Sequence, residues 1–228
     1  GTGSFGNKFV SEALKRFKKI KRLIIFSRDE LKQSEMEKQF PKKKYNCIRY
    51  FIGDVRDEAR LDVATRNVDV IIHSAALKQV PATEYNPFEC IKTNVLGAQN
   101  IINCAIRNKV NKVIALSTDK AVSPINLYGA SKLCADKLFT SAQSYVGSNK
   151  TIFAVARYGN VMNSRGSVIP LFLNQKKKNL LTITDKNMTR FNITLKDAVD
   201  MVFWTIKNSL GGEIFVPKIP SYKILDLA

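Results

Sequence analysis

Residues 117–132 carry the side chains best suited to proton and hydride chemistry, in the order Ser-Thr-Asp-Lys-Ala-Val-Ser-Pro-Ile-Asn-Leu-Tyr-Gly-Ala-Ser-Lys. Pro124 and Asn126 break the chain before a helical pattern begins. Tyr128 and Lys132 are four residues apart on that helix, so we expect both side chains on one face. An ammonium near a phenol favours the phenolate and lowers its pKa from about 10 toward neutrality. Such a tyrosine takes a proton from a hydroxyl while a hydride leaves the same carbon.

Three polar residues, Thr118, Asp119 and Lys120, precede this helix. They follow the apolar run 113–116, which predicts a buried strand of a parallel sheet. Ligands of open α/β sheets bind at the carboxyl ends of the strands. Tyr-x-x-x-Lys alone is as readily explained by an amphipathic helix with an exposed lysine. Its position just after polar residues at a strand end favours a catalytic site.

Composition limits the kinds of site to consider. The chain has 228 residues, of which 45% are hydrophobic, which is enough for a substantial core. Its apolar runs are too short to span a bilayer, and no signal peptide opens it. The four cysteines include no Cys-x-x-Cys pair, which favours core thiols in a reducing compartment, so we expect a cytoplasmic protein. The single histidine, His73, argues against a His-based metal centre, and we expect no metal.

The formal charge of +18 suggests an anionic partner. Lysines and arginines gather in 15–22, 42–44 and 176–178. No interleaved aromatic platform, zinc finger or recognition-helix pattern accompanies them. We therefore interpret these clusters as solvated surface and expect neither nucleic-acid binding nor membrane insertion.

The chain opens with Gly1-Thr2-Gly3-Ser4-Phe5-Gly6, followed by a helical pattern. Glycines let the backbone approach a pyrophosphate, and the helix N-terminus supplies N–H donors and a positive dipole end. The motif is weak by itself because the strand that should precede it is absent. The run 22–27 then predicts a strand ending in Ser27, Arg28 and Asp29.

The residues after this strand bear on the choice of cofactor. An acidic residue there would hold the ribose 2′-hydroxyl of NAD, whereas Ser27, Arg28 and Lys32 offer donors suited to a 2′-phosphate. Asp29 keeps NAD open, and Arg28 could be a plain surface charge, but we favour NADP. Asp54, after the strand 47–52, could accept from an adenine amino group or could only cap a turn.

Strands and helices alternate along the rest of the chain. We expect further strands at 68–73, 151–156, 180–184 and 214–216, and helices at 88–107 and 195–207. Alternation of this kind predicts an α/β fold with a doubly wound parallel sheet and helices on both faces. Asn94 lies inside the long helix and is followed by Gly97, which costs helix propensity and suggests that Asn94 faces a polar group.

With these residues laid out, the sequence resembles the extended short-chain dehydrogenases/reductases. More narrowly, it is similar to the nucleotide-sugar 4,6-dehydratases that act on UDP-N-acetylglucosamine and invert C5. The motifs that carry the resemblance are residues 1–6, 27–36, 51–57, 84–87, 116–121, 125–132, 157–161, 164–167 and 211–218.

The resemblance implies a role for each matching residue. The catalytic group would be Thr118, Asp119, Lys120, Tyr128 and Lys132, the last two also touching the cofactor. The pyrophosphate of NADP would lie on Thr2, Gly3, Ser4, Phe5 and Gly6. Its 2′-phosphate would meet Ser27, Arg28, Asp29, Glu30, Leu31 and Lys32. Further cofactor contacts would come from Asp54, Val55, Ser74, Val161, Met162, Asn163, Ser164 and Arg165. The UDP-sugar would meet Lys78, Leu96, Gly97, Asn160 and Arg190, with Arg190 on the uridine diphosphate.

The resemblance also implies an organisation. Residues 1–158 would form an NADP-binding Rossmann-type domain, and residues 159–228 part of a substrate-binding region whose strands return to the core. The family has a first strand and one more glycine before Gly1, so the chain is similar to a fragment lacking that strand. We expect a homo-oligomer for the full-length protein.

Two alternatives to the dehydratase remain. A nucleotide-sugar 4-epimerase or reductase on the same fold needs only the hydride pair, and Asp119 with Lys120 argues against it. C5-retaining dehydratases carry Asp-Glu at that place. A non-enzymatic basic protein that binds anions is the distant alternative.

Overall fold

The computed structural model describes residues 1–147, 150–162, 168–177 and 179–228. Its helices are α1 Ser4–Arg16, α2 Glu30–Gln39, α3 Glu58–Thr65, α4 Val80–Tyr85, α5 Pro87–Ile91, α6 Gly97–Arg107, α7 Leu127–Ala142, α8 Val168–Lys176, α9 Leu195–Asn208 and α10 Ile224–Leu227. Its strands are β1 Leu23–Ser27, β2 Ile48–Ile52, β3 Val70–His73, β4 Lys112–Thr118, β5 Ile152–Tyr158, β6 Asn160–Val161, β7 Thr189–Ile193, β8 Ile214–Phe215 and β9 Ser221–Lys223. Within these ranges no helix has the length and apolar content to cross a membrane.

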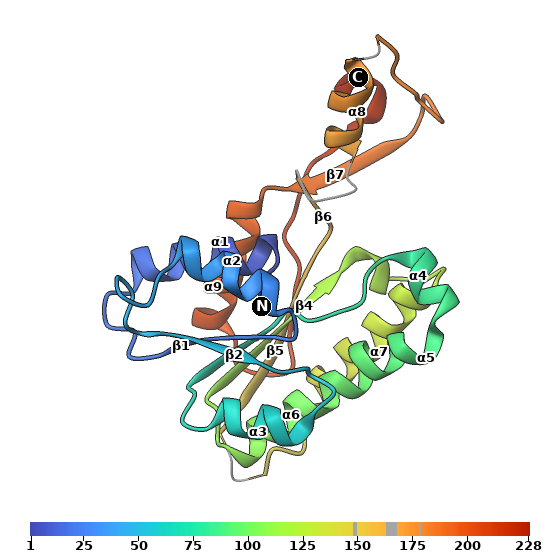
Figure 1. Cartoon of the computed structure of the whole chain (residues 1–228). Coiled ribbons are helices and arrows are strands. Elements are labelled where there is room, and N and C mark those ends of the chain that lie inside the picture. Colours follow the sequence, from blue (N-terminus) through green and yellow to red (C-terminus); the bar gives the residue numbers. More distant parts are fainter. Residues whose placement is uncertain (148–149, 163–167, 178) are drawn as a thin grey trace.

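Parallel strands form the centre of the molecule (Figure 1). β3, β4, β5 and β8 pair in that order, all parallel, and β1 pairs with β2 in the same sense. Because parallel strands all point the same way, their carboxyl ends meet at one edge. Helices cover both faces, so the predicted α/β fold with a doubly wound parallel sheet is confirmed.

Alternating side chains of the central strands make two cores. Val113 and Ala115 of β4 pack with helices α6 and α7, whose largest fully buried contribution is Phe139. Ile114 and Leu116 point to the other face and pack with Val202 of α9 and with α1. This two-residue period follows from strand geometry, and it explains why β4 reads as an unbroken apolar run.

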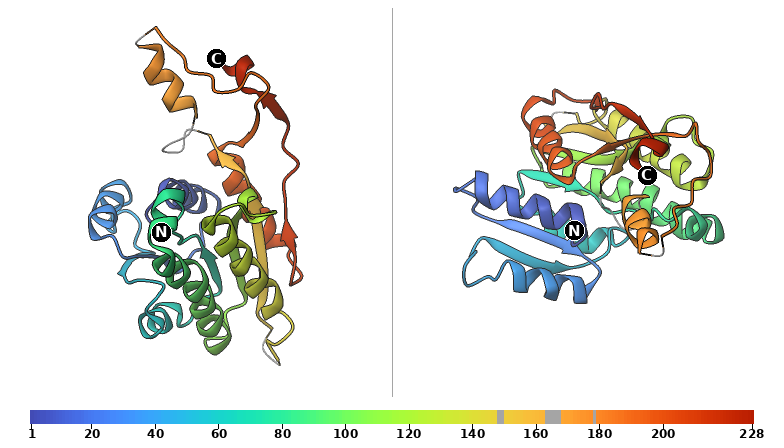
Figure 2. Two further views of the ribbon diagram at one scale, coloured as in Figure 1. Left: turned by 90° about the vertical axis from the view of Figure 1, so that its right-hand side faces the viewer. Right: turned by 90° about the horizontal axis from the view of Figure 1, so that it is seen from above.

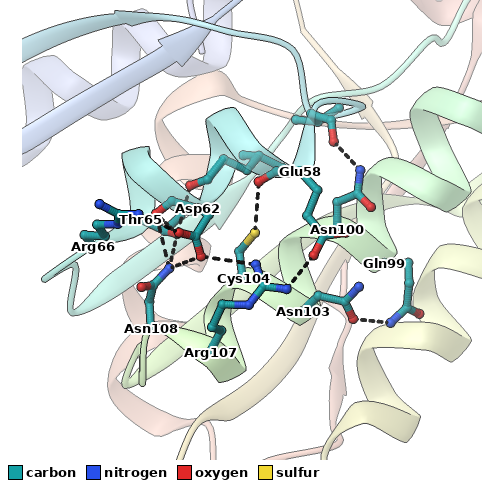
Figure 3. Close-up of polar contacts among 12 residues, drawn as sticks. Glu58, Asp62, Thr65, Arg66, Gln99, Asn100, Asn103, Cys104, Arg107 and Asn108 are labelled. Carbon is teal, nitrogen blue, oxygen red and sulfur yellow. Dashed lines mark hydrogen bonds and ion pairs between the residues drawn. The ribbon is translucent and has the colours of Figure 1, made fainter.

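Helices α3 and α6 are joined by a polar network on the outside of the sheet (Figure 3). Arg107 of α6 donates to Glu58 at 2.7 Å and to Asp62 at 3.2 Å, both on α3. Cys104 is buried behind it, and burial raises the pKa of its thiol to about 11. The network holds α6, and through α6 the neighbouring α7, in place on the sheet.

Two sequence predictions need correction. The segment 180–184 is not a strand. The side chain of Gln175 accepts a hydrogen bond from the Thr182 backbone N–H and donates to its hydroxyl, which holds the segment in an irregular path. The predicted helix at 88–107 is α5 and α6 joined by one π-helical turn, Lys92–Leu96.

The last part of the chain lies beyond the carboxyl edge of the main sheet (Figure 2). There β6 pairs with β7 in parallel, and β7 pairs with β9 antiparallel. Between these strands the chain returns to the main sheet, where α9 packs on its face and β8 extends it beside β5. A small second sheet therefore stands beyond the edge where the parallel strands end (Figure 1 and Figure 2).

His73 gives a test of this packing. It ends β3 and is 3% exposed, and its ring centre lies 5.6 Å from that of Phe139, with the two rings tilted by 42°. Burial lowers the pKa of His73 to about 3, assisted by the charge of Lys132. In the unfolded chain this histidine binds a proton with a pKa near 6.5, whereas in the folded chain it stays neutral. The stability that is present above pH 6.5 is therefore lost as the pH falls toward the pKa of the folded state.

We therefore expect His73 to cost the protein about 2 kcal/mol of unfolding free energy between pH 7 and pH 5. Urea unfolding of the wild type and of His73→Phe at both pH values measures this difference. The variant should lose less stability than the wild type on acidification. Equal losses in the two proteins would contradict a buried neutral imidazole.

Candidate active site

The turn after β4 and the start of α7 approach each other closely. Thr118 ends β4, a 3₁₀ turn covers Asp119–Ala121, and Asn126 caps α7 by accepting from the Gly129 N–H at 2.9 Å. A Cβ at Gly129 would stand 2.2 Å from the backbone oxygen of Lys120. Only glycine allows this approach, and it brings Tyr128 beside the strand end.

Asp119 and Lys120 form the polar centre of this edge. The Thr118 hydroxyl donates to Asp119 Oδ1 at 2.9 Å, and Lys120 Nζ donates to the same oxygen at 3.1 Å. Lys120 Nζ also lies 3.4 Å from Oδ1 of Asn160 on β6. Both side chains of the ion pair are partly exposed, at 29% for Asp119 and 39% for Lys120. A carboxylate and an ammonium thus face a common space within reach of a ligand.

A cavity of about 400 Å³ adjoins Asp119. Its walls come from the end of β5 at Tyr158 and Gly159, from Phe191 on β7 and from the segment 216–219. Gly159 is required here because a Cβ would lie 2.2 Å from the Phe191 ring. The lining is mostly apolar and includes the charged side chains of Asp119 and Arg157, which suits a ligand with a polar reacting end.

Tyr128 and Lys132 share one face of α7, as the four-residue spacing predicts, but their electrostatics differ from the expectation. Burial raises the pKa of Tyr128, a hydrogen bond with Thr118 lowers it, and the charge of Asp119 raises it further. Lys132 is 4% exposed and donates to the Leu116 carbonyl at 2.7 Å. In the protein alone the phenol is therefore protonated at neutral pH, because desolvation is the largest effect.

The N-terminus of α1 fits a phosphate group. Side chains cap the starts of α2, α3, α7 and α9, whereas α1, like α4, α5, α6 and α10, has none. The cap position of α1 is Gly3, and its first turn holds no acidic residue. A Cβ at Gly3 would meet no atom within 4 Å, so the space over this backbone is open. Thr2 is fixed beside it, 3.1 Å from the Ser27 hydroxyl. Ser4 and Gly6 follow in the first turn, and Phe5 packs toward the core.

The residues after β1 are paired with one another. Asp29 caps α2 by accepting from the Lys32 N–H at 2.9 Å, and Lys32 Nζ lies 2.7 Å from its other oxygen. Arg28 lies 3.5 Å from Asp54, which follows β2. Glu30 and Leu31 are exposed in the first turn of α2. The carboxyl edge at which α1 begins therefore also holds three potential cofactor ligands, Ser27, Arg28 and Asp54.

Some predicted site residues pack internally instead of facing the edge. Val55 is 7% exposed and lies against Gly97, where a Cβ would stand 2.8 Å from the valine Cγ2. Leu96 is exposed on the π-helical turn, and Ser74 and Lys78 are exposed after β3.

Asn94 does face polar groups, as predicted, but these belong to the protein. It bonds the Leu77 backbone N–H at 2.8 Å and carbonyl at 2.9 Å, and it donates to Ser131 on α7 at 2.9 Å. Ser131 in turn donates to the Tyr128 carbonyl at 2.8 Å. Asn94 therefore ties the loop after β3 to the helix that carries the tyrosine.

The remaining predicted residues lie in the small sheet or beyond it. Val161 pairs with β7, and Met162 is partly exposed just after β6. Arg190 is exposed on β7 and donates to the Thr189 carbonyl, so no contact joins it to the Thr118–Tyr128 group in the described ranges. Asn163, Ser164 and Arg165 lie outside the described residues.

Sequence reasoning missed a buried group below the tyrosine. Asp136 on α7 accepts from Ser117 of β4 at 2.7 Å and from Arg157 of β5 at 2.7 Å. The spacing from Lys132 to Asp136 equals that from Tyr128 to Lys132, which was the available signal. The pairing with β5 could not be inferred, because it depends on strand order.

Comparison with known proteins supports one family. The whole chain, residues 1–228, matches the family described as polysaccharide biosynthesis protein. It is 56% identical over 230 residues to a UDP-N-acetylglucosamine 4,6-dehydratase (inverting) of Campylobacter jejuni subsp. jejuni serotype O:23/36 (strain 81-176), covering 100% of this chain and 68% of the relative. It is 50% identical over 231 residues to a UDP-glucose 4-epimerase of Rickettsia akari (strain Hartford), covering 100% of this chain and 67% of that protein.

Solved structures give the same picture. The X-ray structure of Pen from Bacillus thuringiensis superposes with a TM-score of 0.91 at 45% identity, over 99% of this chain and 71% of that one. A dTDP-glucose 4,6-dehydratase from Streptomyces venezuelae, solved with NAD and TYD bound, has a TM-score of 0.83 at 21% identity, over 99% and 76%. The second likeness shows the fold alone.

The state of Tyr128 can be measured directly. Because burial raises its pKa, we expect this phenol to stay protonated up to about pH 10 in nucleotide-free protein. A difference titration of tyrosinate absorbance between the wild type and Tyr128→Phe should show no ionisation below that pH. Tyr85, which is 87% exposed, provides the comparison through the variant Tyr85→Phe. A Tyr128 signal near neutrality would contradict the burial effect.

Proposed function

This chain belongs to the polysaccharide biosynthesis protein family, and from that premise we propose that it is a nucleotide-sugar 4,6-dehydratase acting on UDP-N-acetylglucosamine with inversion at C5. The observation that carries the proposal is the Asp119–Lys120 pair, 3.1 Å apart at the end of β4 and next to Tyr128. A 4,6-dehydration needs an acid and a base near the carbon that is oxidised. The 56% identical Campylobacter relative bears the name of this reaction.

The reaction begins at the sugar 4-hydroxyl. Tyr128, protonated in the protein alone, must first lose its own proton to solvent when cofactor and substrate are bound. As a phenolate it then accepts the hydroxyl proton while C4 loses a hydride, which leaves a ketone. The ammonium of Lys132 stabilises this phenolate, and the Thr118 hydroxyl would assist by turning its proton from Asp119 toward the phenol oxygen. The protonated resting state of Tyr128 means that this support must act when cofactor and substrate are in place.

Asp119 and Lys120 carry out the elimination. The C4 ketone makes the C5 proton acidic. Lys120 first passes a proton across the 3.1 Å contact to Asp119 and then removes the C5 proton as a neutral amine. Asp119 donates a proton to the departing 6-hydroxyl, which leaves as water. The hydride then returns to C6 and a proton to C5 from the opposite face, so the net change is loss of one water molecule. Each positioned proton transfer contributes about 10²–10⁴-fold to the rate.

We propose NADP as the hydride carrier. When bound, it would supply a reversible hydride acceptor that is regenerated in each turnover. The uncapped start of α1 with the open space over Gly3 suits its pyrophosphate. Ser27, Arg28 and Lys32 suit its 2′-phosphate, because Asp29 is already engaged as the cap of α2. Ser74, Asp54 and the chain from Val161 onward would complete the binding of the nucleotide.

On the substrate side we propose that Asn160, Lys78 and Arg190 contact the UDP-sugar. Asn160 lies 3.4 Å from Lys120, and this supports a role for it near the sugar. Arg190 stands on the small sheet above that edge and would pair with the diphosphate. Residues 1–158 would then serve the nucleotide cofactor, and residues 159–228 would serve the substrate.

We also propose a cytoplasmic homo-oligomer. The four cysteines are free, as expected in a reducing compartment. Tyr85, Phe88 and Ile91 on α4 and α5 are exposed apolar side chains on neighbouring elements, which a second copy could cover.

A 4-epimerase is the second candidate, favoured by the name of the 50% identical Rickettsia relative. That reaction needs Tyr128 and Lys132 but no acid–base pair. Incubation with UDP-N-acetylglucosamine and with UDP-glucose, followed by NMR of the products, separates the two. A 4-keto-6-deoxy sugar supports the dehydratase, and a C4 epimer without loss of water would overturn it.

Variants of the acid–base pair should stop the second half of the reaction. Asp119→Asn and Lys120→Ala are expected to lower the dehydration rate by about 10²–10⁴-fold. Elimination then limits the rate, so a C4-deuterium isotope effect on the rate should shrink toward unity. Lys137→Ala, an exposed lysine of α7, is the matched control and should behave as the wild type. An undiminished dehydration rate in either site variant would remove the pair from the mechanism.

Arg28 tests the choice of nucleotide. A lost charge-assisted contact costs about 1.5–3 kcal/mol, so Arg28→Ala should weaken NADP⁺ binding about 10- to 100-fold and leave NAD⁺ binding nearly unchanged. Calorimetric titration of both nucleotides measures this. Arg66→Ala, an exposed arginine of α3's C-cap, controls for the change in net charge. Equal effects on both nucleotides would contradict a role on the 2′-phosphate.

A further inference from the structure

Three charged side chains are buried together beneath Tyr128. Lys132 is 4% exposed and Asp136 1% exposed, and they stand one turn apart on α7. Arg157 reaches them from β5 with its side chain 14% exposed. Buried charges are costly unless they are compensated, so this arrangement of two cations and one anion requires a reason.

The two oxygens of Asp136 have different surroundings. Oδ2 accepts from the Ser117 hydroxyl at 2.7 Å and from Arg157 Nη2 at 2.7 Å and Nε at 3.2 Å. Oδ1 is buried and receives no hydrogen bond from any residue that the structure describes. The carboxylate is thus anchored through one oxygen, while the charge on the other is not satisfied by a direct donor.

Lys132 is a buried cation without a direct ion-pair partner among the described residues. Its ammonium donates to the Leu116 carbonyl at 2.7 Å, and no carboxylate of the described chain lies within ion-pair distance. Burial lowers the pKa of Lys132, and the charge of Asp136 raises it. The other titratable groups near the pair are neutral: His73 of β3 is held uncharged by burial, and Tyr128 is protonated. Cys90 of α5 is buried, and its thiol donates to the Ser131 hydroxyl at 3.4 Å.

We propose that Asp136 is a positioning residue for the hydride-transfer pair: anchored by Arg157 and Ser117, its carboxylate keeps the buried Lys132 as an ammonium at the pH where the enzyme works. The inference rests on the proposed function, because it explains how Lys132 stays positively charged beside the catalytic Tyr128. Without Asp136, the positive Arg157 and the desolvated site both favour loss of the Lys132 proton. Tyr128 would then have no cation to support its negative oxygen.

The first test is the pH profile of kcat for dehydration of UDP-N-acetylglucosamine. Asp136→Asn keeps the shape of the side chain and removes its charge, so the alkaline limb should move to lower pH by at least one unit. Ser117→Ala removes a hydrogen bond to the same oxygen but keeps the charge, and its limb should stay in place. Asp136→Glu should also keep the wild-type limb. A purely structural Asp136 would lower the rate of Asp136→Asn at every pH without moving the limb, and that result would overturn the proposal.

The second test needs no enzymatic activity. In a double-mutant cycle by urea unfolding, Asp136→Asn should cost less stability in a Lys132→Met background than in the wild type, because the charge it compensates is gone. If Asp136→Asn alone does not fold, the double variant should. Additive losses, or a double variant that also fails to fold, would contradict the proposal. Coupling in a protein that does not dehydrate the sugar would overturn the proposed function and leave the role of Asp136 toward Lys132 standing.

Discussion

The close approach of α7 to the turn after β4 is the constraint on which the site depends. A Cβ at Gly129 would lie 2.2 Å from the Lys120 carbonyl, so the helix can begin here only because that residue has no side chain. The approach places the tyrosine of α7 beside the polar residues that end β4. Parallel pairing of β3, β4 and β5 then brings the other strand ends to the same edge. Backbone packing therefore determines where the polar side chains of the site meet, independently of their charges.

Burial at this edge has opposite effects on the groups it surrounds. It raises the pKa of Tyr128 and lowers that of Lys132, so both side chains tend toward their neutral forms. The charge of Asp136 opposes this effect at Lys132, because it raises the pKa of the lysine. Asp119 and Lys120 stay partly exposed and paired, which leaves them available for proton transfer. One edge of the sheet thus holds the buried Tyr128 and Lys132, which we propose for hydride transfer, next to the more open Asp119 and Lys120, which we propose for elimination.

Local sequence signals were enough for most of the fold. Short unbroken apolar runs located the main strands, and the Pro124–Asn126 break located the start of α7. The segment 180–184 was wrongly expected to be a strand, because its alternating pattern has no partner strand and Gln175 satisfies its backbone instead. The candidate site was located through the spacing of Tyr128 and Lys132. The Asp136–Arg157 pair and the burial of the phenol depend on tertiary neighbours, which local patterns do not contain.

The central claim is that C4 is oxidised only so that C5 and C6 can lose water, with the same hydride returned to C6. The most direct test uses UDP-N-acetylglucosamine deuterated at C4, turned over by the purified protein and followed by NMR. The account predicts that the deuterium appears in the C6 methyl group of a 4-keto-6-deoxy product with inverted C5. Deuterium that remains at C4, or is lost to solvent, would contradict it.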